Sequence, residues 1–231
     1  MKAPAIVLML GVFLLGDASL ACAAPHHQKA SRLAPGYGEL EFTLPAVGSY
    51  SLPGLGLAED AEVLTSLGLE ATLHGLMAGK FTLLSFIFTR CSDVNGCPLA
   101  SFVLAKVQGR VAADPILKDY VRLVSISFDP ANDTPEVMEQ YAEHFRQTGV
   151  DWDFVSTRTE QEMAAILEAY NQFIIKEYDD EGKLLGSISH MLRVYLIDNE
   201  HEIRNIYSVS YLHPDTVIND IRTIVANHAV K

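Results

Sequence analysis

Two cysteines lie close together at a point where a predicted strand gives way to a predicted helix. An apolar run from Leu83 to Phe88 indicates a buried strand, and the loop after it carries Cys91 and Cys97. Pro98 fits the first turn of a helix, where its missing N–H costs nothing. The N-terminus of a helix favours the thiolate form of a cysteine, because its dipole and free N–H groups stabilise negative charge. The pattern therefore predicts redox or soft-metal chemistry at this loop.

The first 23 residues have the features of a secretory signal. Lys2 precedes an apolar segment from Ala5 to Leu15, and Ala21-Cys22-Ala23 matches a small-residue cleavage site. Cleavage after Ala23 would leave Cys91 and Cys97 in an oxidising compartment, where we expect a disulfide at rest. Two alternatives stay open, namely a lipid-modified Cys22 and an uncleaved anchor. We predict an exported protein, periplasmic or membrane-associated and facing the periplasm, with membrane association only through its N-terminus.

Charge and turn content describe the rest of the chain. The formal net charge of −12 at pH 7 argues against nucleic acid as a partner, because nucleic-acid-binding surfaces are basic. Residues 24–48 are polar and rich in turn formers, so we expect a flexible arm, with a possible short strand from Glu39 to Leu44. Residues 49–231 are expected to form one domain around a single core.

Strands and helices alternate along this domain. Strands are predicted over Ser49–Leu55, Ala71–Leu73, Phe81–Thr89, Val121–Phe128, Trp152–Val155, Met191–Ile197 and Glu202–Val209, and helices over 98–113, 135–148, 160–169 and 214–227. Lys176 to Gly186 is expected to be a surface hairpin or loop, and His190 to begin the next strand. A cysteine pair after the first buried strand of such a pattern is typical of thioredoxin-like proteins. We therefore predict an α/β, thioredoxin-like three-layer fold in which helices flank a central mixed sheet, with an added N-terminal hairpin.

Several segments resemble, in register, the SCO/SenC family of thioredoxin-like proteins, which assist copper delivery to cytochrome c oxidase. The stretch from Gly79 to Cys91 is similar to the family's strand before its first cysteine, and Cys97-Pro98 is similar to its second. Residues 125–135, SISFDPANDTP, are similar to the family's S-x-D-P-x-x-D-T-P segment. His190 precedes a Y-L-I-D strand, as the family's ligand histidine does. The resemblance extends from about residue 48 to 228.

The resemblance implies that Cys91, Cys97 and His190 bind copper. Thiolates are soft ligands that select Cu(I), and an imidazole completes a three-coordinate site that also admits Cu(II). Taken alone, His190 would instead be interpreted as an ordinary hydrogen-bonded histidine. Asp129 and Asp133 could orient the loop or hydrogen-bond a partner. Turn chemistry favours another interpretation, in which they form an Asp-Pro turn and cap the next helix.

The cysteine spacing departs from the family pattern. The usual spacing is C-x-x-x-C-P, whereas five residues separate Cys91 from Cys97. Asn95 and Gly96 make the loop flexible enough to bring both sulfurs together, so a disulfide remains easy to form, whereas a copper site is less preorganised. The insertion therefore weakens the metal interpretation more than the redox one.

Two functions follow from these features. We predict an exported copper-binding metallochaperone that assists maturation of the copper centre of cytochrome c oxidase, with the copper-accepting subunit of the oxidase as partner. The alternative is a thiol–disulfide oxidoreductase in which Cys91 and Cys97 are the redox pair and another thiol protein is the partner. An inert structural disulfide is the third interpretation.

Overall fold

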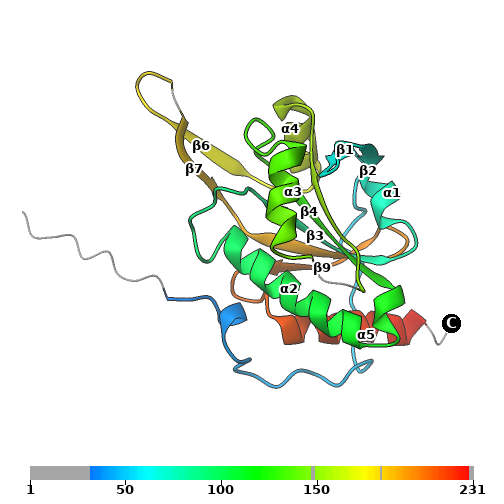
Figure 1. Ribbon diagram of the computed structural model, residues 1–231. Coiled ribbons are helices and arrows are strands. Elements are labelled where there is room, and N and C mark those ends of the chain that lie inside the picture. Colours follow the sequence, from blue (N-terminus) through cyan, green and yellow to red (C-terminus); the bar gives the residue numbers. More distant parts are fainter. Residues whose placement is uncertain (1–31, 147–148, 183, 229–231) are drawn as a thin grey trace, which may run out of the picture. The chain divides into compact units, whose positions relative to one another are not determined.

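The computed structural model describes residues 32–146, 149–182 and 184–228 (Figure 1). The predicted signal segment with Cys22, and residues 24–31 of the expected arm, lie outside the described residues. A compact unit begins at Leu33 and includes the predicted domain. In the described part of the chain, no helix is both long enough and apolar enough to cross a membrane.

A mixed sheet forms the centre of this unit and has seven strands within the described residues. In spatial order they are β2 (Glu70–Thr72), β1 (Glu62–Thr65), β5 (Trp152–Ser156), β4 (Val121–Ser127), β3 (Phe81–Ile87), β8 (Arg193–Ile197) and β9 (Ile203–Ser208). Strand β4 runs parallel to both β3 and β5, whereas the outer strands pair antiparallel. All of β3 is buried, as expected for a central parallel strand covered on both faces. The predicted central mixed sheet is therefore confirmed.

Helices cover the two faces of this sheet. Helix α2 (Cys97–Ala113) packs against α5 (Pro214–His228). Helix α3 (Pro135–Glu143) lies on the same side, because Tyr141 Oη is 2.7 Å from Ser101 Oγ of α2. Helix α4 (Glu160–Ala169) leads into Tyr170, whose ring lies 5.5 Å from that of Phe86. The remaining helical segments are α1 (Leu73–Met77) and the 3₁₀ turns η1 (Pro35–Tyr37) and η2 (Leu117–Asp119).

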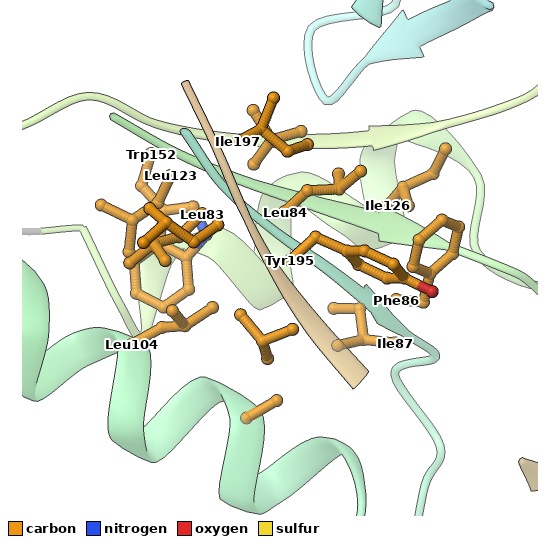
Figure 2. Packing of buried hydrophobic residues seen from close by; sticks show 14 of the residues in the cluster. Leu83, Leu84, Phe86, Ile87, Leu104, Leu123, Ile126, Trp152, Tyr195 and Ile197 are labelled. Atoms are coloured by element: carbon orange, nitrogen blue, oxygen red, sulfur yellow. The ribbon is translucent and has the colours of Figure 1, made fainter. Parts of the chain in front are cut away.

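Successive side chains of β3 point to opposite faces of the sheet, so the core has two halves. Leu83 lies on the same side as Leu104 of α2, whereas Leu84 and Phe86 point to the other side (Figure 2). Because both faces of β3 are packed, its C-terminal end is held firmly. The loop with Cys91 leaves from that end.

Two further strands, β6 (Ile174–Tyr178) and β7 (Leu184–His190), form a separate two-stranded sheet in the described part of the chain. This hairpin extends away from the central sheet (Figure 1). The hairpin option predicted around Lys176–Gly186 is confirmed, but His190 ends β7 rather than beginning the next strand. The reason is that the pairing of β7 with β6 continues as far as the His190–Ile174 pair, and β8 starts only at Arg193.

The added N-terminal hairpin is confirmed as β1 and β2, but its predicted first strand was wrong. Ser49–Leu55 is not a strand, because Pro53 has no N–H to donate to a ladder. The chain after it makes only an isolated bridge between Leu57 and Glu202. Glu39–Leu44 is not a strand either, and α3 ends at Glu143, short of the predicted end.

Candidate metal centre

Cys97 is the first residue of α2 and is buried beside the end of β3, with 1% of its surface exposed. Its Sγ accepts a hydrogen bond from the backbone N–H of Phe88 at 3.4 Å. The same sulfur lies 3.6 Å from Nε2 of His190. Burial, followed by the contact with the Cys91 thiol, raises the pKa of Cys97. The buried sulfur is therefore held in the protonated form while it faces an imidazole nitrogen.

Cys91 lies on the loop and is partly exposed. A hydrogen bond from the Cys97 thiol lowers the pKa of Cys91 to about 6, although partial burial opposes this effect. Gly96 lies against this thiol, since a Cβ there would be 3.3 Å from both Cys91 Sγ and the Asp93 carbonyl oxygen and would crowd them. The two predicted cysteines are thus brought together as free thiols, the exposed one favouring the thiolate form.

His190 enters the site from the base of the β6–β7 hairpin. Its ring lies 4.9 Å from that of Phe128 and 6.1 Å from that of Phe88, which follow β4 and β3. Burial lowers the pKa of His190, so the imidazole is neutral at pH 7 and keeps a lone pair for a metal or a proton donor. Cys97 and His190 are far apart in the sequence. These aromatic contacts and the β6–β7 pairing bring them together in space.

The two aspartates of the SISFDPANDTP segment hold the start of the cysteine loop. Asp133 is fully buried and accepts hydrogen bonds from Thr89 N–H at 3.0 Å, Thr89 Oγ1 at 2.5 Å and Ser127 Oγ at 2.5 Å. Asp129, also buried, accepts from the Arg90 guanidinium at 2.9 Å. The turn expected from turn chemistry is present. The expected helix-capping role was wrong, because Asp133 accepts from Thr89 and Asp129 accepts from Arg90, the two residues before Cys91.

A cavity of about 200 Å³ opens beside the exposed thiol. Its lining residues are Phe88, Arg90, Cys91, Ser92, Asp93, Ile188, Ser189 and His190. A larger cavity of about 740 Å³ lies between α4 and β6 and contains neither cysteine. The thiol pair is therefore open to solvent on the side of Cys91 and His190, while Cys97 is buried.

The donor set suits a soft metal ion, since two thiols and one neutral imidazole match the preferences of copper. Their contacts are pairwise, from Cys91 to Cys97 and from Cys97 to His190. Across the described residues, no three histidine, cysteine or acidic side chains are grouped closely enough to hold a metal ion. A three-ligand site would therefore need an adjustment of the Cys91 loop or of the hairpin that carries His190.

The chain is a thioredoxin-like domain whose central strand ends beside two thiols and an imidazole. This arrangement is that of a protein class whose chemistry uses thiols or soft metal ions. A family model described as SCO1/SenC matches residues 70–226. The match covers more than half of the chain, which therefore belongs to the SCO1/SenC family.

Individual relatives agree with this assignment. The SCO1 protein homolog of Bacillus subtilis is 26% identical over 157 residues, which cover 68% of this chain and 76% of the relative. The crystal structure of Arabidopsis thaliana ScoI with copper bound matches with a TM-score of 0.63 and 20% identity, over 74% of this chain and 99% of that one. The structure of BsSco matches with a TM-score of 0.59 and 24% identity, over 76% of this chain and 96% of that one. BsSco is described as a member of the Sco family of cytochrome c oxidase assembly proteins, and a disulfide switch was identified in it. These likenesses confirm the predicted fold.

Proposed function

We propose that this protein binds copper as cargo through Cys91, Cys97 and His190 and passes it to the copper-accepting subunit of cytochrome c oxidase. The observation that carries the proposal is the 3.6 Å contact between Cys97 Sγ and His190 Nε2, with the Cys91 thiol against Cys97. Soft thiolates favour Cu(I), and a neutral imidazole adds a third donor. Relatives solved with copper bound, and one described as an oxidase assembly protein, support the same role.

The test is an anaerobic Cu(I) titration of the reduced protein against a chelator of known affinity. Wild type should bind about one copper ion, and His190→Ala should bind it at least tenfold more weakly, because losing a directly bound ligand costs more than the tenfold or greater effect typical of residues that support ligands. His144→Ala is the matched control, because His144 is an exposed histidine at the end of α3. Equal affinity of wild type and His190→Ala would rule out the three-ligand site.

The location of this activity is also part of the proposal. We infer export through the N-terminal segment, with residues 49–231 as the thioredoxin-like domain. Intact-mass measurement of the protein isolated from its native membrane and soluble fractions separates the three forms. Cleavage after Ala23, a lipid on Cys22 and an uncleaved segment each give a different mass, and a full-length cytoplasmic product would contradict export.

A second function, thiol–disulfide exchange, is favoured by the different exposure of the two thiols. Cys91 is partly exposed, whereas Cys97 is buried behind it. The Cys91 thiolate would attack a partner disulfide, so that an S–S bond forms to one partner sulfur and the other leaves as a thiolate. Cys97 would then lose its proton and attack Cys91 Sγ, which oxidises the pair to a disulfide and releases the partner as a dithiol.

Cys97→Ser should trap this intermediate, because it keeps the attacking thiol and removes the resolving one. A covalent partner should be recovered from the exported fraction, and reductant should release it. Cys91→Ser is the control and should trap nothing, since its remaining sulfur is buried. Failure of Cys97→Ser to trap any partner would count against this second function.

A further inference from the structure

We infer that residues 34–37, here called the N-terminal strap, hold the cysteine loop (residues 91–97) in place and act as positioning residues for the thiol pair. The consequence for copper affinity rests on the proposed function. The positioning itself does not, because it concerns contacts within the chain.

Two hydrogen bonds join the strap to the loop. The backbone N–H of Ala34 donates to Asn95 Oδ1 at 2.8 Å, and the Tyr37 hydroxyl donates to the Val94 carbonyl at 2.6 Å. Val94 and Asn95 belong to the loop that is longer here than the C-x-x-x-C-P spacing. A longer loop has more conformations to lose when its ends are fixed. The strap therefore forms its hydrogen bonds with the part of the loop that the longer spacing makes conformationally freer.

The strap is itself firmly attached to the domain. Gly36 is buried, and a Cβ there would lie 2.3 Å from the Leu212 carbonyl and 2.9 Å from Val103 Cγ2, so only glycine fits. The Tyr37 ring packs on Phe102 of α2 with 4.9 Å between centroids. Backbone hydrogen bonds from Tyr37 to Ala34 at 3.1 Å and from Gly38 to Pro35 at 2.9 Å close the turn. A segment that is packed against the domain thus contacts the cysteine loop through two hydrogen bonds.

The held residues are adjacent to both thiols. Gly96 donates its N–H to the Asp93 carbonyl at 2.9 Å, and Asn95 N–H bonds to Asp93 Oδ1 at 3.0 Å, so residues 93–96 form a closed turn. Gly96 then caps α2 directly before Cys97, and it is also the residue against which Cys91 Sγ lies. Fixing Val94 and Asn95 therefore limits how far Cys91 can move away from Cys97.

The test compares Tyr37→Phe with Tyr50→Phe. Tyr37→Phe keeps the ring on Phe102 and removes only the bond to Val94. Tyr50 is the matched control, because its hydroxyl also attaches a stretch of chain before β1 to a helix. It donates to Asp220 Oδ1 of α5 at 2.6 Å and does not bond to the cysteine loop. Hydrogen exchange of the loop peptide in the reduced, copper-free protein is the primary measurement, and Cu(I) affinity is the second.

We expect Tyr37→Phe to speed exchange in residues 91–97 and to weaken Cu(I) binding by about three- to tenfold, the range for losing one hydrogen bond. Tyr50→Phe should leave both at wild-type values. Asn95→Ala should reproduce the effect of Tyr37→Phe through the other bond. Loop exchange in Tyr37→Phe and Asn95→Ala equal to wild type would overturn the inference. If the loop loosens but wild type binds no copper, the strap stands and the proposed copper function fails.

Discussion

Asp133 is a buried carboxylate whose hydrogen-bond partners are two uncharged residues, Thr89 and Ser127, and not a basic side chain. It accepts two bonds from Thr89 and one from Ser127 and is fully buried, and within the described residues no basic side chain forms an ion pair with it. Hydrogen bonds to an ionised group are stronger than neutral ones, and a buried charge that loses them is costly. Because Thr89 is two residues before Cys91, this carboxylate joins the end of β4 to the beginning of the cysteine loop.

Asp133→Asn should lower the free energy of unfolding by about 1–3 kcal/mol, because an amide cannot accept all three bonds. Urea unfolding followed by circular dichroism measures the change. Glu143→Gln is the matched control, since Glu143 is an exposed carboxylate at the end of the neighbouring helix α3, and its effect should stay within about 0.5 kcal/mol. Equal stabilities of Asp133→Asn and wild type would show that the carboxylate does not stabilise the fold.

Residue types and spacing were enough to find the two thiols, because cysteines after a buried strand carry a recognisable pattern. His190 was found through resemblance, since nothing local separates a ligand histidine from an ordinary one. The direction of the Asp129 and Asp133 side chains was not predictable. Local turn chemistry satisfies an aspartate in an Asp-Pro turn equally well, and only the parallel pairing of β3 with β4 brings Thr89 and Arg90 within reach.

At the scale of elements, the site combines a firmly held part with a weakly held one. Cys97 belongs to α2, which packs on the fully buried β3. His190 belongs to the β6–β7 hairpin, which has only two strands and is separate from the central sheet of the described chain. Phe173 and Ile175 at the start of this hairpin are 72% and 64% exposed, so they contribute little burial to hold it. Two-stranded hairpins are marginally stable on their own.

We therefore expect amide hydrogens of β6 and β7 to exchange roughly 100-fold or more faster than those of β3 and β4, because local opening needs less free energy than global unfolding. Adding Cu(I) should slow exchange in the hairpin if His190 is a ligand, since binding would fix its base. Hydrogen-exchange mass spectrometry with and without copper measures both effects.

The His190→Ala protein is the control for this experiment, because its hairpin should exchange at the same rate with and without copper. Slower exchange confined to residues 91–97 in wild type would contradict a role for His190, since the thiols alone would then hold the metal.

The difference between firmly packed and weakly packed elements also explains which of them could be predicted from the sequence. The central strands and the long helices have continuous apolar runs or amphipathic periods, and their observed bounds lie close to the predicted ones. The first strand of the N-terminal hairpin was misplaced, because Glu62–Thr65 is short and only one of its residues is buried. Its strand form depends on pairing with β2 and β5, which is tertiary information.

At the scale of the whole molecule, the candidate site is assembled from separate parts of one fold. One thiol comes from the loop after β3 and the other from the beginning of α2, and the imidazole comes from a hairpin much later in the chain. Two thiols separated by five residues stay near each other even in an unfolded chain, whereas His190 approaches them only after folding. Copper binding and folding stability are therefore linked mainly through His190.

This linkage gives a prediction for the complete molecule. A ligand that binds both folded and unfolded chains stabilises the fold only by the ratio of its two affinities, and each tenfold difference adds about 1.4 kcal/mol. With saturating Cu(I), the free energy of unfolding of wild type should rise by at least about 1.4 kcal/mol, because the folded state offers the third donor.

In His190→Ala the rise should largely vanish, although the thiol pair still binds some copper in both states. Anaerobic urea unfolding with and without Cu(I) measures the difference, and His144→Ala should behave as wild type. An undiminished rise in His190→Ala would mean that the folded thiol pair alone distinguishes the native from the unfolded chain, and the histidine would then be excluded as a ligand.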